Sequence, residues 1–315
     1  MPAAGDAGFA GFAHHACLYG TDEEFLAMAV PFVRDGLSAG EPVLAATTPA
    51  NLGLLRRALG EGAHALDTAD SARFGPRPVE RVTAFLRYHD RRARPGRRTR
   101  MLAEPVWSGR SARQVAEWKR MESGLNVLLG TLPVWMICPY DTRTAAADVL
   151  RAARATHPVL VEGRRLVPCG SYVEPAAYAA SVPPPRAPVP AGAARIGPTT
   201  RLAAVRGFAR ERAAAAGLTG DRLGLAELAV AEAATSLLTG GAGRLGARSW
   251  HERGVLAYEL LHPAPLAPYA GYRPPGPAPH PEDGLWLART LTESLDIHRR
   301  GPLTRVTLRF TLLSG

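Results

Sequence analysis

Val134-Trp-Met-Ile-Cys138 is an uninterrupted apolar run in the first half of the chain. Strands buried on both faces of a parallel sheet have this composition, whereas half-exposed strands alternate apolar and polar residues. A stretch with helical spacing of apolar residues, 113–129, comes just before it. This order of strand-like and helical patterns recurs along residues 21–138 and predicts a layered α/β domain.

The segments before this run supply the other elements of that domain. Thr21-Asp-Glu-Glu24 has the form of a capping box, and apolar residues at helical spacing continue to Leu37. Thr48-Pro49 starts a second helix, because proline suits the first helical turn. The remaining expected elements are strands at 42–47 and 101–103 and a helix at 79–88.

A proline-rich segment divides the chain. Prolines 183, 184, 185, 188 and 190 favour an extended spacer that forms neither a helix nor a central strand. We therefore predict a first domain at 10–172, a linker at 173–197 and a second domain at 198–315. In the second domain, the patterns predict an α+β sandwich with helices at 200–216, 221–239 and 284–293 and strands at 247–251, 255–261 and 305–312.

Composition limits the classes of function. The formal net charge is +10, but Lys119 is the only lysine, and no glycine run precedes it. This excludes a P-loop and disfavours lysine Schiff-base enzymes. The densest basic run, 91–100, is broken by Pro95-Gly96 and has no interleaved aromatic residues. We therefore expect a solvated loop there, and a nucleic-acid partner would rest on net charge alone.

The sequence also bears on location and metal binding. No run is long and apolar enough to span a membrane, and the N-terminus lacks a signal-peptide pattern, so we expect a cytoplasmic protein with no membrane partner. Cys17, Cys138 and Cys169 stand at distant positions and form neither a disulfide framework nor a CxxC metal site.

Several motifs of the first domain resemble, in their order, one family of sensory domains. They are His14-His-Ala-Cys-Leu-Tyr19 with Asp22-Glu-Glu-Phe25, Gly40-Glu-Pro-Val43, Glu104-Pro-Val-Trp107, Glu122-Ser-Gly-Leu-Asn126, Cys138-Pro-Tyr-Asp141 and Thr156-His-Pro158. As a set they resemble the MEDS sensory domain of bacterial and archaeal regulators. The resemblance implies a fold like the RecA/P-loop α/β domains without the phosphate-binding lysine, and a role in sensing a ligand or signal.

Six polar residues of this domain are candidates for contact with a sensed small molecule. Glu104 and Asp141 follow strand patterns, and open α/β sheets bind ligands at the carboxyl ends of their strands. We therefore expect a ligand pocket at that edge, formed by these two residues and His14. The full candidate set is His14, Cys17, Glu104, Glu122, Asp141 and His157.

Simpler roles remain open for some of these residues. His157 precedes a proline and could cap a helix, and Glu122 could be solvated or cap a helix. Cys138 ends an apolar run, where a cysteine usually behaves as a small buried hydrophobe. We therefore expect no stable metal site in this domain.

The second domain resembles a different family. Glu232-Ala-Ala-Thr-Ser236, Leu256-Ala-Tyr-Glu-Leu-Leu261 and Gly284-Leu-Trp-Leu-Ala-Arg289 follow the order of motifs in the HATPase module of anti-sigma regulatory serine kinases, within the GHKL superfamily. That resemblance implies an ATP site in which Glu232 is the general base. It also implies an asparagine ligand to Mg²⁺ at the position of Ser236 in this chain.

Departures from the family pattern fall at the nucleotide contacts. A hydroxyl at Ser236 is a poorer metal ligand than an amide oxygen. His262-Pro-Ala264 stands where the family has Asp-x-Gly against adenine, and Glu282-Asp283 adds negative charge before Gly284. We expect Ser236, His262 and Gly284 to be degenerate ATP-site positions, with no cofactor and no catalysis.

These observations predict a cytoplasmic signalling or transcription regulator. A sensory domain would control a degenerate anti-sigma-kinase-like module that binds a sigma factor or an anti-sigma antagonist. The alternative is an active protein serine/threonine kinase that uses ATP and Mg²⁺, in which Glu232 is catalytic. Related kinase modules form homodimers, so a homodimer is also implied, although no residue pattern here shows one.

Overall fold

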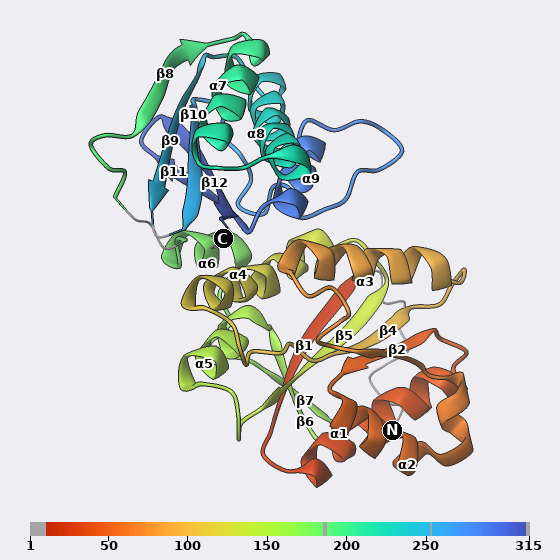
Figure 1. The fold of residues 1–315 in the computed structure, drawn as a ribbon. Coiled ribbons are helices and arrows are strands. Elements are labelled where there is room, and N and C mark those ends of the chain that lie inside the picture. Colours follow the sequence, from red (N-terminus) through yellow and green to blue (C-terminus); the bar gives the residue numbers. More distant parts are fainter. Residues whose placement is uncertain (1–10, 185–187, 253, 313–315) are drawn as a thin grey trace. The chain divides into compact units, whose positions relative to one another are not determined.

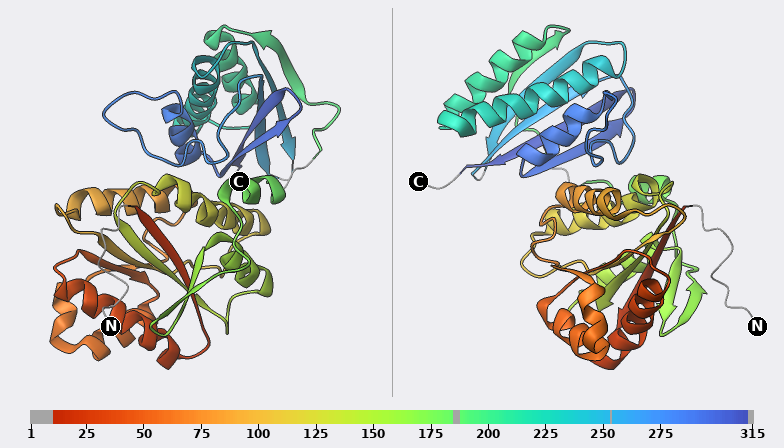
Figure 2. Two further views of the ribbon diagram at one scale, coloured as in Figure 1. Left: turned by 180° about the vertical axis from the view of Figure 1, so that it is seen from behind. Right: turned by 90° about the vertical axis from the view of Figure 1, so that its right-hand side faces the viewer.

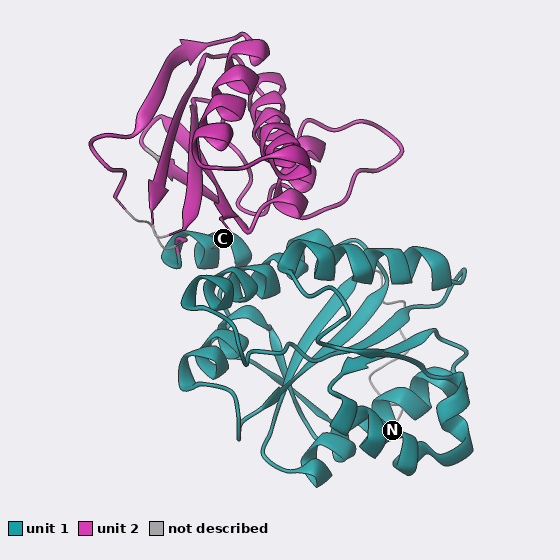
Figure 3. Ribbon diagram, in the orientation of Figure 1, with its two compact units in different colours: residues 1–182 teal, residues 183–315 magenta. Residues whose placement is uncertain are grey.

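A computed structural model describes residues 11–184, 188–252 and 254–312 (Figure 1). The chain divides into two compact units, residues 1–182 and 183–315 (Figure 3). None of the described helices has the length and apolarity needed to cross a membrane.

The first unit is built on a seven-stranded sheet with the order β3-β2-β4-β5-β1-β6-β7. Its strands are β1 (Phe12–Tyr19), β2 (Val43–Thr47), β3 (Asp67–Asp70), β4 (Thr99–Ala103), β5 (Val134–Asp141), β6 (Val159–Glu162) and β7 (Arg165–Pro168). Neighbouring strands are parallel except that β7 runs antiparallel to β6. The predicted α/β class with a largely parallel sheet is therefore confirmed.

Helices cover both faces of this sheet (Figures 1 and 2). They are α1 (Asp22–Ser38), α2 (Pro49–Leu59), the 3₁₀ helix η1 (Gly60–Ala65), α3 (Pro78–Arg92), α4 (Ala112–Leu128), α5 (Ala147–Thr156) and α6 (Pro175–Ser181). α1 and α2 lie on one face, and α3 and α4 lie on the other. Thr21 caps α1 by accepting a hydrogen bond from the Glu24 amide, whereas the Glu24 carboxylate bonds the Gly20 amide rather than the capping residue.

The two central strands, β1 and β5, pair along their whole length from Phe12–Val134 to Tyr19–Asp141. Residues of β1 point alternately to the two faces of the sheet, so His14 and Ala16 lie on one face and Cys17 and Tyr19 on the other. Cys17 and Tyr19 join the apolar core beneath α1 and α2. One strand therefore contributes side chains to two separate environments.

Part of the predicted linker is helical. Residues Pro175–Ser181 form α6, Tyr178 is buried, and an Arg120 guanidinium N–H donates to the Val182 carbonyl at 3.2 Å. Proline at the first helical position is compatible with a helix, and the next proline is Pro183. The expectation of an extended spacer is wrong for this stretch.

The second unit is a five-stranded antiparallel sheet with helices on one face, as the right-hand view of Figure 2 shows. The strand order is β11-β12-β10-β9-β8. The elements are β8 (Ala194–Thr199), α7 (Leu202–Ala215), α8 (Gly220–Thr239), β9 (Leu245–Glu252), β10 (Val255–His262), α9 (Asp283–Leu291), β11 (Ser294–Arg300) and β12 (Leu303–Thr311). The predicted arrangement of helices beside an antiparallel sheet is confirmed, while β8 and β11 were not predicted.

Candidate functional site

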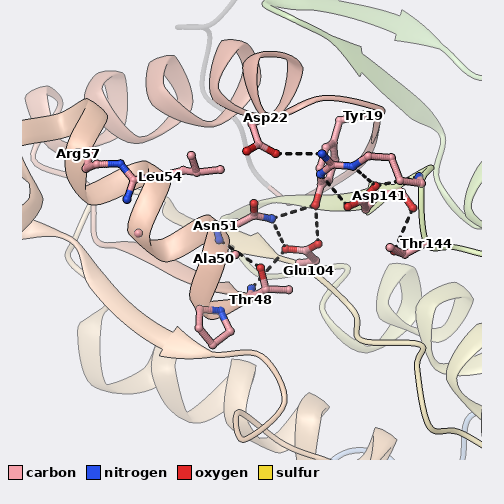
Figure 4. A pocket seen from close by; sticks show the side chains of 13 residues that line it. Tyr19, Asp22, Thr48, Ala50, Asn51, Leu54, Arg57, Glu104, Asp141 and Thr144 are labelled. Carbon is pink, nitrogen blue, oxygen red and sulfur yellow. Dashed lines mark hydrogen bonds and ion pairs between the residues drawn. The ribbon is translucent and has the colours of Figure 1, made fainter.

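A pocket of about 460 Å³ lies at the carboxyl edge of the first sheet (Figure 4). β2, β4, β5 and β1 are parallel neighbours, so their carboxyl ends meet at this edge. Tyr19 and Asp141 end β1 and β5, Thr48 follows β2, and Glu104 follows β4. The lining residues are Tyr19, Asp22, Thr48, Pro49, Ala50, Asn51, Gly53, Leu54, Arg57, Glu104, Asp141, Arg143 and Thr144.

The carboxylate of Glu104 is the most heavily bonded group of this pocket. Tyr19 Oη donates to Oε1 at 2.8 Å, and Asn51 Nδ2 donates to Oε2 at 2.9 Å. The Thr47 hydroxyl also donates to Oε2, and the Thr48 amide lies 3.4 Å from it. Neutral donors therefore satisfy a carboxylate that is only 5 % exposed.

Tyr19 is fixed from two sides. Its hydroxyl donates to Glu104 and accepts a hydrogen bond from Asn51 Nδ2 at 2.9 Å. Burial and the neighbouring Glu104 carboxylate raise the pKa of Tyr19 above its ordinary value, so the phenol stays protonated at neutral pH. The back wall of the pocket is thus a closed hydrogen-bond network formed by Tyr19, Asn51 and Glu104.

A surface ion-pair group lies beside Tyr19, with the Arg143 guanidinium 5.7 Å from the centre of the Tyr19 ring (Figure 4). The Arg143 guanidinium donates to both carboxylate oxygens of Asp141 at 2.9 Å and to Asp22 at 3.1 Å. These hydrogen bonds hold the pKa of Asp141 below its ordinary value. Arg57 also lines the pocket and is exposed, and it makes no hydrogen bond or ion pair with any residue that the structure describes.

The turn between β1 and α1 disfavours a phosphate. Asp22, Glu23 and Glu24 occupy the first turn of α1, and Thr21 and Glu24 bond amides at the start of the helix. A phosphate at a helix N-terminus needs free N–H groups and gains from the positive end of the helix dipole. Here side chains already bond the Gly20 and Glu24 amides, and three carboxylates place negative charge beside the first turn.

A second polar group is buried under α4 and α5. It consists of His14 on β1, Glu122 on α4, Cys138 on β5 and His157 at the end of α5, and one ligand atom from each lies within 4.8 Å of the others. His14 Nε2 is 3.4 Å from Cys138 Sγ and 3.8 Å from Glu122 Oε2, and His157 Nε2 is 3.7 Å from Glu122 Oε2.

Burial dominates the titration of this cluster. It raises the pKa of Glu122 to about 7 and raises the pKa of Cys138 well above its ordinary value. It lowers the pKa of His157 to about 3, and it lowers that of His14, helped by His157. Both imidazoles are therefore neutral at neutral pH, which leaves each ring with one nitrogen lone pair.

The structure separates the predicted site residues into two groups. Glu104 and Asp141 line the pocket, whereas His14 faces the buried cluster with Glu122 and His157. The expected single pocket containing His14, Glu104 and Asp141 is therefore not formed, because His14 lies on the other face of β1 from Tyr19. His157 does cap α5, as one alternative predicted, whereas Glu122 is buried and not solvated.

Two cysteines depart from their expected roles. Cys17 was a candidate sensor residue, but it is buried in the core under α1 and belongs to neither group. Its burial and the nearby Glu24 raise the pKa of the Cys17 thiol to about 12. Cys138 is buried, as expected, but it contacts His14 instead of serving only as an apolar side chain.

The pocket also contains three residues that were not predicted as site residues: Asn51, Tyr19 and Arg143. A usable signal existed for Asn51, because it shares the helical spacing of Leu55 and Leu59 and therefore lies on the buried face of α2. A polar residue on an apolar helix face needs a buried partner. Tyr19 and Arg143 offered no comparable pattern.

Two positions of the second unit that resemble a nucleotide site, Ser236 and Gly284, pack against each other. A Cβ built on Gly284 would meet the Glu232 carbonyl oxygen at 2.6 Å and Ser236 Oγ at 2.7 Å. α9 therefore packs directly on the turn of α8 that contains both residues. Ser236 is 2 % exposed, and its hydroxyl has no hydrogen-bond partner in the described structure.

His262 is enclosed in the same way at the end of β10. It has no exposed surface, and its Nδ1 accepts a hydrogen bond from the Ala264 amide at 3.1 Å. A Cβ on Gly243 would approach His262 Nε2 to 3.1 Å and Pro263 Cγ to 2.4 Å. The loop after α8 therefore packs on His262, and desolvation lowers the pKa of its imidazole.

The first unit thus has the features of a small-molecule-binding α/β domain: a parallel sheet and a polar pocket at the carboxyl edge of its strands. Residues 13–158 match the family described as MEDS, MEthanogen/methylotroph, DcmR Sensory domain. The predicted resemblance is confirmed for this segment, which is less than half of the chain and lies within the first unit. A search of curated proteins finds no match to this chain.

Proposed function

We propose that this chain is a signalling regulator whose first unit senses a small polar molecule in the pocket at the carboxyl edge of its sheet. The main support is the hydrogen-bond network around Glu104, which holds Tyr19 and Asn51 in place without a ligand. Preformed walls reduce the ordering cost of binding. The match of residues 13–158 to a sensory family supports the same function.

The charges of the pocket narrow the ligand class. Asp22 and Asp141 are paired with Arg143, and Glu104 is surrounded by neutral donors, so none of these charges needs a counter-ion from a ligand. The acidic first turn of α1 disfavours a polyphosphate. These features support a compact ligand with hydroxyl, amide or single-carboxyl groups, recognised by hydrogen bonds and by Arg57.

A thermal-shift screen of hydroxy acids, amino acids and sugars on the full chain tests this proposal, followed by calorimetry of the compounds that stabilise it. Arg57→Ala is the informative variant because Arg57 is exposed, lines the pocket and makes no hydrogen bond or ion pair with the described residues. We expect it to weaken binding about tenfold, in keeping with the loss of one charged hydrogen bond. Arg56→Ala, the neighbouring exposed arginine, is the matched control and should bind like the wild type. If the wild type, Arg57→Ala and Arg56→Ala bind the compound with equal affinity, the compound does not bind in this pocket.

We further propose that the second unit is a degenerate anti-sigma-kinase-like module that acts by binding a protein and not by catalysis. The contact of Gly284 with Glu232 and Ser236 supports this proposal, because a metal at Ser236 would need α9 to move. Calorimetry of the full chain with Mg²⁺-ATP is the test. Micromolar binding would favour the active kinase instead. If the wild type does not bind Mg²⁺-ATP, the double variant Ser236→Asn and His262→Asp tests whether restoring the family's metal ligand and adenine contact recovers ATP binding.

The partner that we propose is a sigma factor or an anti-sigma antagonist, on the basis of the family resemblance. An exposed apolar pair on α8 is available for such a contact, because Leu225 is 43 % and Leu228 is 40 % exposed. Binding to purified sigma factors and antagonists from the source organism should fall at least tenfold in the double variant Leu225→Ser and Leu228→Ser. Leu166→Ser, an exposed leucine of the first unit, is the control. Unchanged binding in the double variant would remove this face of α8 from the proposal.

A further inference from the structure

The buried cluster of His14, Glu122, Cys138 and His157 is a set of metal-binding groups that the proposed sensing function does not use. Two imidazoles, a carboxylate and a thiol come from β1, α4, β5 and the end of α5. All are almost completely buried. What decides their role is which lone pairs point into the centre of the cluster.

The tautomer of His14 follows from its neighbour Asn126. Asn126 Nδ2 donates to the carbonyl oxygens of Thr156 at 2.9 Å and Ser123 at 3.2 Å, which assigns the other amide atom as oxygen. That oxygen lies 3.3 Å from His14 Nδ1 and can only accept. The His14 proton is therefore on Nδ1, and Nε2 offers its lone pair to the cluster.

His157 has the same orientation for a different reason. Its Nδ1 lies 2.8 Å from the carbonyl oxygen of Ala153, which can only accept, so the proton of the neutral ring is on Nδ1. The lone pair of Nε2 then points toward Glu122 Oε2, 3.7 Å away. Backbone or amide oxygens that fix the outer nitrogen of a histidine are the usual second shell of a metal site.

The spacing of the inward atoms fits a tetrahedral ion. Zn–N bonds of about 2.0–2.1 Å and Zn–S bonds of about 2.3 Å give tetrahedron edges of about 3.3–3.6 Å. The separations along three edges are 3.4 Å from Cys138 Sγ to His14 Nε2, and 3.8 and 3.7 Å from Glu122 Oε2 to His14 and His157. Small side-chain shifts would bring these atoms into coordination distance.

Without an ion, the cluster leaves polar atoms unsatisfied. Glu122 Oε2 and His157 Nε2 are buried and have no hydrogen-bond partner among the described residues. Two acceptor lone pairs that face one another at 3.7 Å do not stabilise each other. The Cys138 S–H can donate to His14 Nε2, and a proton on Glu122 would serve His157, whereas a cation would bind the carboxylate, the thiolate and both rings at once.

We propose that His14 Nε2, His157 Nε2, Glu122 Oε2 and Cys138 Sγ bind one divalent transition-metal ion, for which Zn²⁺ is the best match. Two imidazoles, a thiolate and a carboxylate are ligands that Zn²⁺ accepts in tetrahedral sites. Four protein ligands leave no open position, which is typical of a structural site and not a catalytic one. The ion would tie α4 and the end of α5 to the two central strands of the first sheet.

Metal analysis of the full chain tests this site. The protein is purified from zinc-supplemented cells, freed of loosely bound metal on a weak chelating resin and measured by elemental mass spectrometry. We expect about one first-row transition-metal ion per chain, as a closed four-ligand site holds a single ion. Less than a tenth of an equivalent, both as purified and after refolding with Zn²⁺, would overturn the proposal.

Cobalt substitution identifies the ligands. Co²⁺ added to metal-free wild-type chain should give a thiolate charge-transfer band together with the strong visible bands of tetrahedral cobalt. Cys138→Ser should lose the charge-transfer band and bind metal at least tenfold more weakly. Cys17→Ser, which changes a buried cysteine of β1 on the opposite face, should keep both. Loss of the band in Cys17→Ser, or its retention in Cys138→Ser, would contradict the assignment, and the metal content of the wild type decides the case if Cys138→Ser does not fold.

Discussion

Glu104 and Glu122 are both buried carboxylates of the first unit, 5 % and 4 % exposed, but their surroundings differ. Glu104 receives hydrogen bonds from Tyr19, Thr47 and Asn51. Among the described residues, Glu122 Oε2 has no hydrogen-bond partner, and it faces His14 Nε2, which contacts Cys138, and His157 Nε2, which has no partner there either. Two glutamates of nearly equal burial therefore differ in hydrogen bonding: both carboxylate oxygens of Glu104 have partners, whereas Glu122 Oε2 has none among the described residues.

The difference separates two kinds of site. A satisfied carboxylate holds its neighbours in place and presents a finished wall to a ligand, as Glu104 does in the pocket. An unsatisfied one predicts a missing component, because buried polar groups without partners are rare and destabilising. The exposed fraction does not distinguish the two glutamates, whereas the number of hydrogen-bond partners of each carboxylate does.

The largest effect is expected for Glu104→Ala. This change leaves the buried donors of Tyr19, Thr47 and Asn51 without their acceptor, so we expect a loss of about 3 kcal/mol or more of unfolding free energy. Urea unfolding of the full chain, followed by tryptophan fluorescence, measures it. Glu61→Ala, at an exposed carboxylate, is the control and should stay within about 0.5 kcal/mol. A loss of that small size in Glu104→Ala would mean that its network does not stabilise the fold.

Removing the proposed metal ion tests whether Glu122 is a ligand. Chelation of the wild-type chain should lower its stability by about 2.7 kcal/mol relative to protein with free metal at a hundred times the dissociation constant. Glu122→Gln should be insensitive to the chelator, whereas Glu61→Ala should respond like the wild type. Thermal unfolding with and without chelator measures the effect. An equal response of wild type and Glu122→Gln would show that Glu122 is not a ligand.

A smaller effect is expected for Tyr19→Phe. The change removes one hydroxyl between Asn51 and Glu104 and should cost about 1–2 kcal/mol. Tyr88→Phe is the matched control, because the Tyr88 hydroxyl donates to Asp67, which is only partly buried. We expect urea unfolding to show the smaller loss for Tyr88→Phe. The reverse order would mean that the Glu104 network is no stronger than an ordinary surface contact.

The smallest effect concerns the exposed wall of the pocket and depends on pH. The folded pKa of Asp141 lies below its ordinary value of 3.8, so its contribution to stability is present above that value and is lost as pH falls through the lowered pKa. Arg143→Gln should therefore be slightly less stable than the wild type at neutral pH, and the gap should close as the pH falls through the lowered pKa of Asp141. Unfolding curves across this range provide the measurement. A gap that persists in acid would have another cause.

Much of the fold could be predicted from residue patterns, and the gaps have physical reasons. β1 was missed because His14 and His15 interrupt its apolar pattern, although both side chains are buried. β5 was expected to end at Cys138, whereas it continues through Pro139 to Asp141. A proline is rarely found in a central strand, so the sequence at Pro139 did not indicate that β5 continues to pair with β1 beyond Cys138.

The sites were predictable only in part. Glu104 and Asp141 lie at the carboxyl edge of the sheet because they follow parallel strands, which a sequence can indicate. The grouping of His14 with Cys138 depends on the register that pairs Ala16 with Cys138 and on the face that each strand residue takes. No pattern in the sequence specifies that register, and none specifies how α4 and α5 lie over the strands.

The alternation of side chains along β1 has a consequence for tolerance to insertions and deletions. His14 points into the metal-binding cluster and Tyr19 into the pocket network. Because strand residues change face at every step, deleting one residue between them would turn one of the two side chains to the wrong face. Loops at the surface absorb changes of length, whereas this strand cannot lose a residue without disabling one of its two sites.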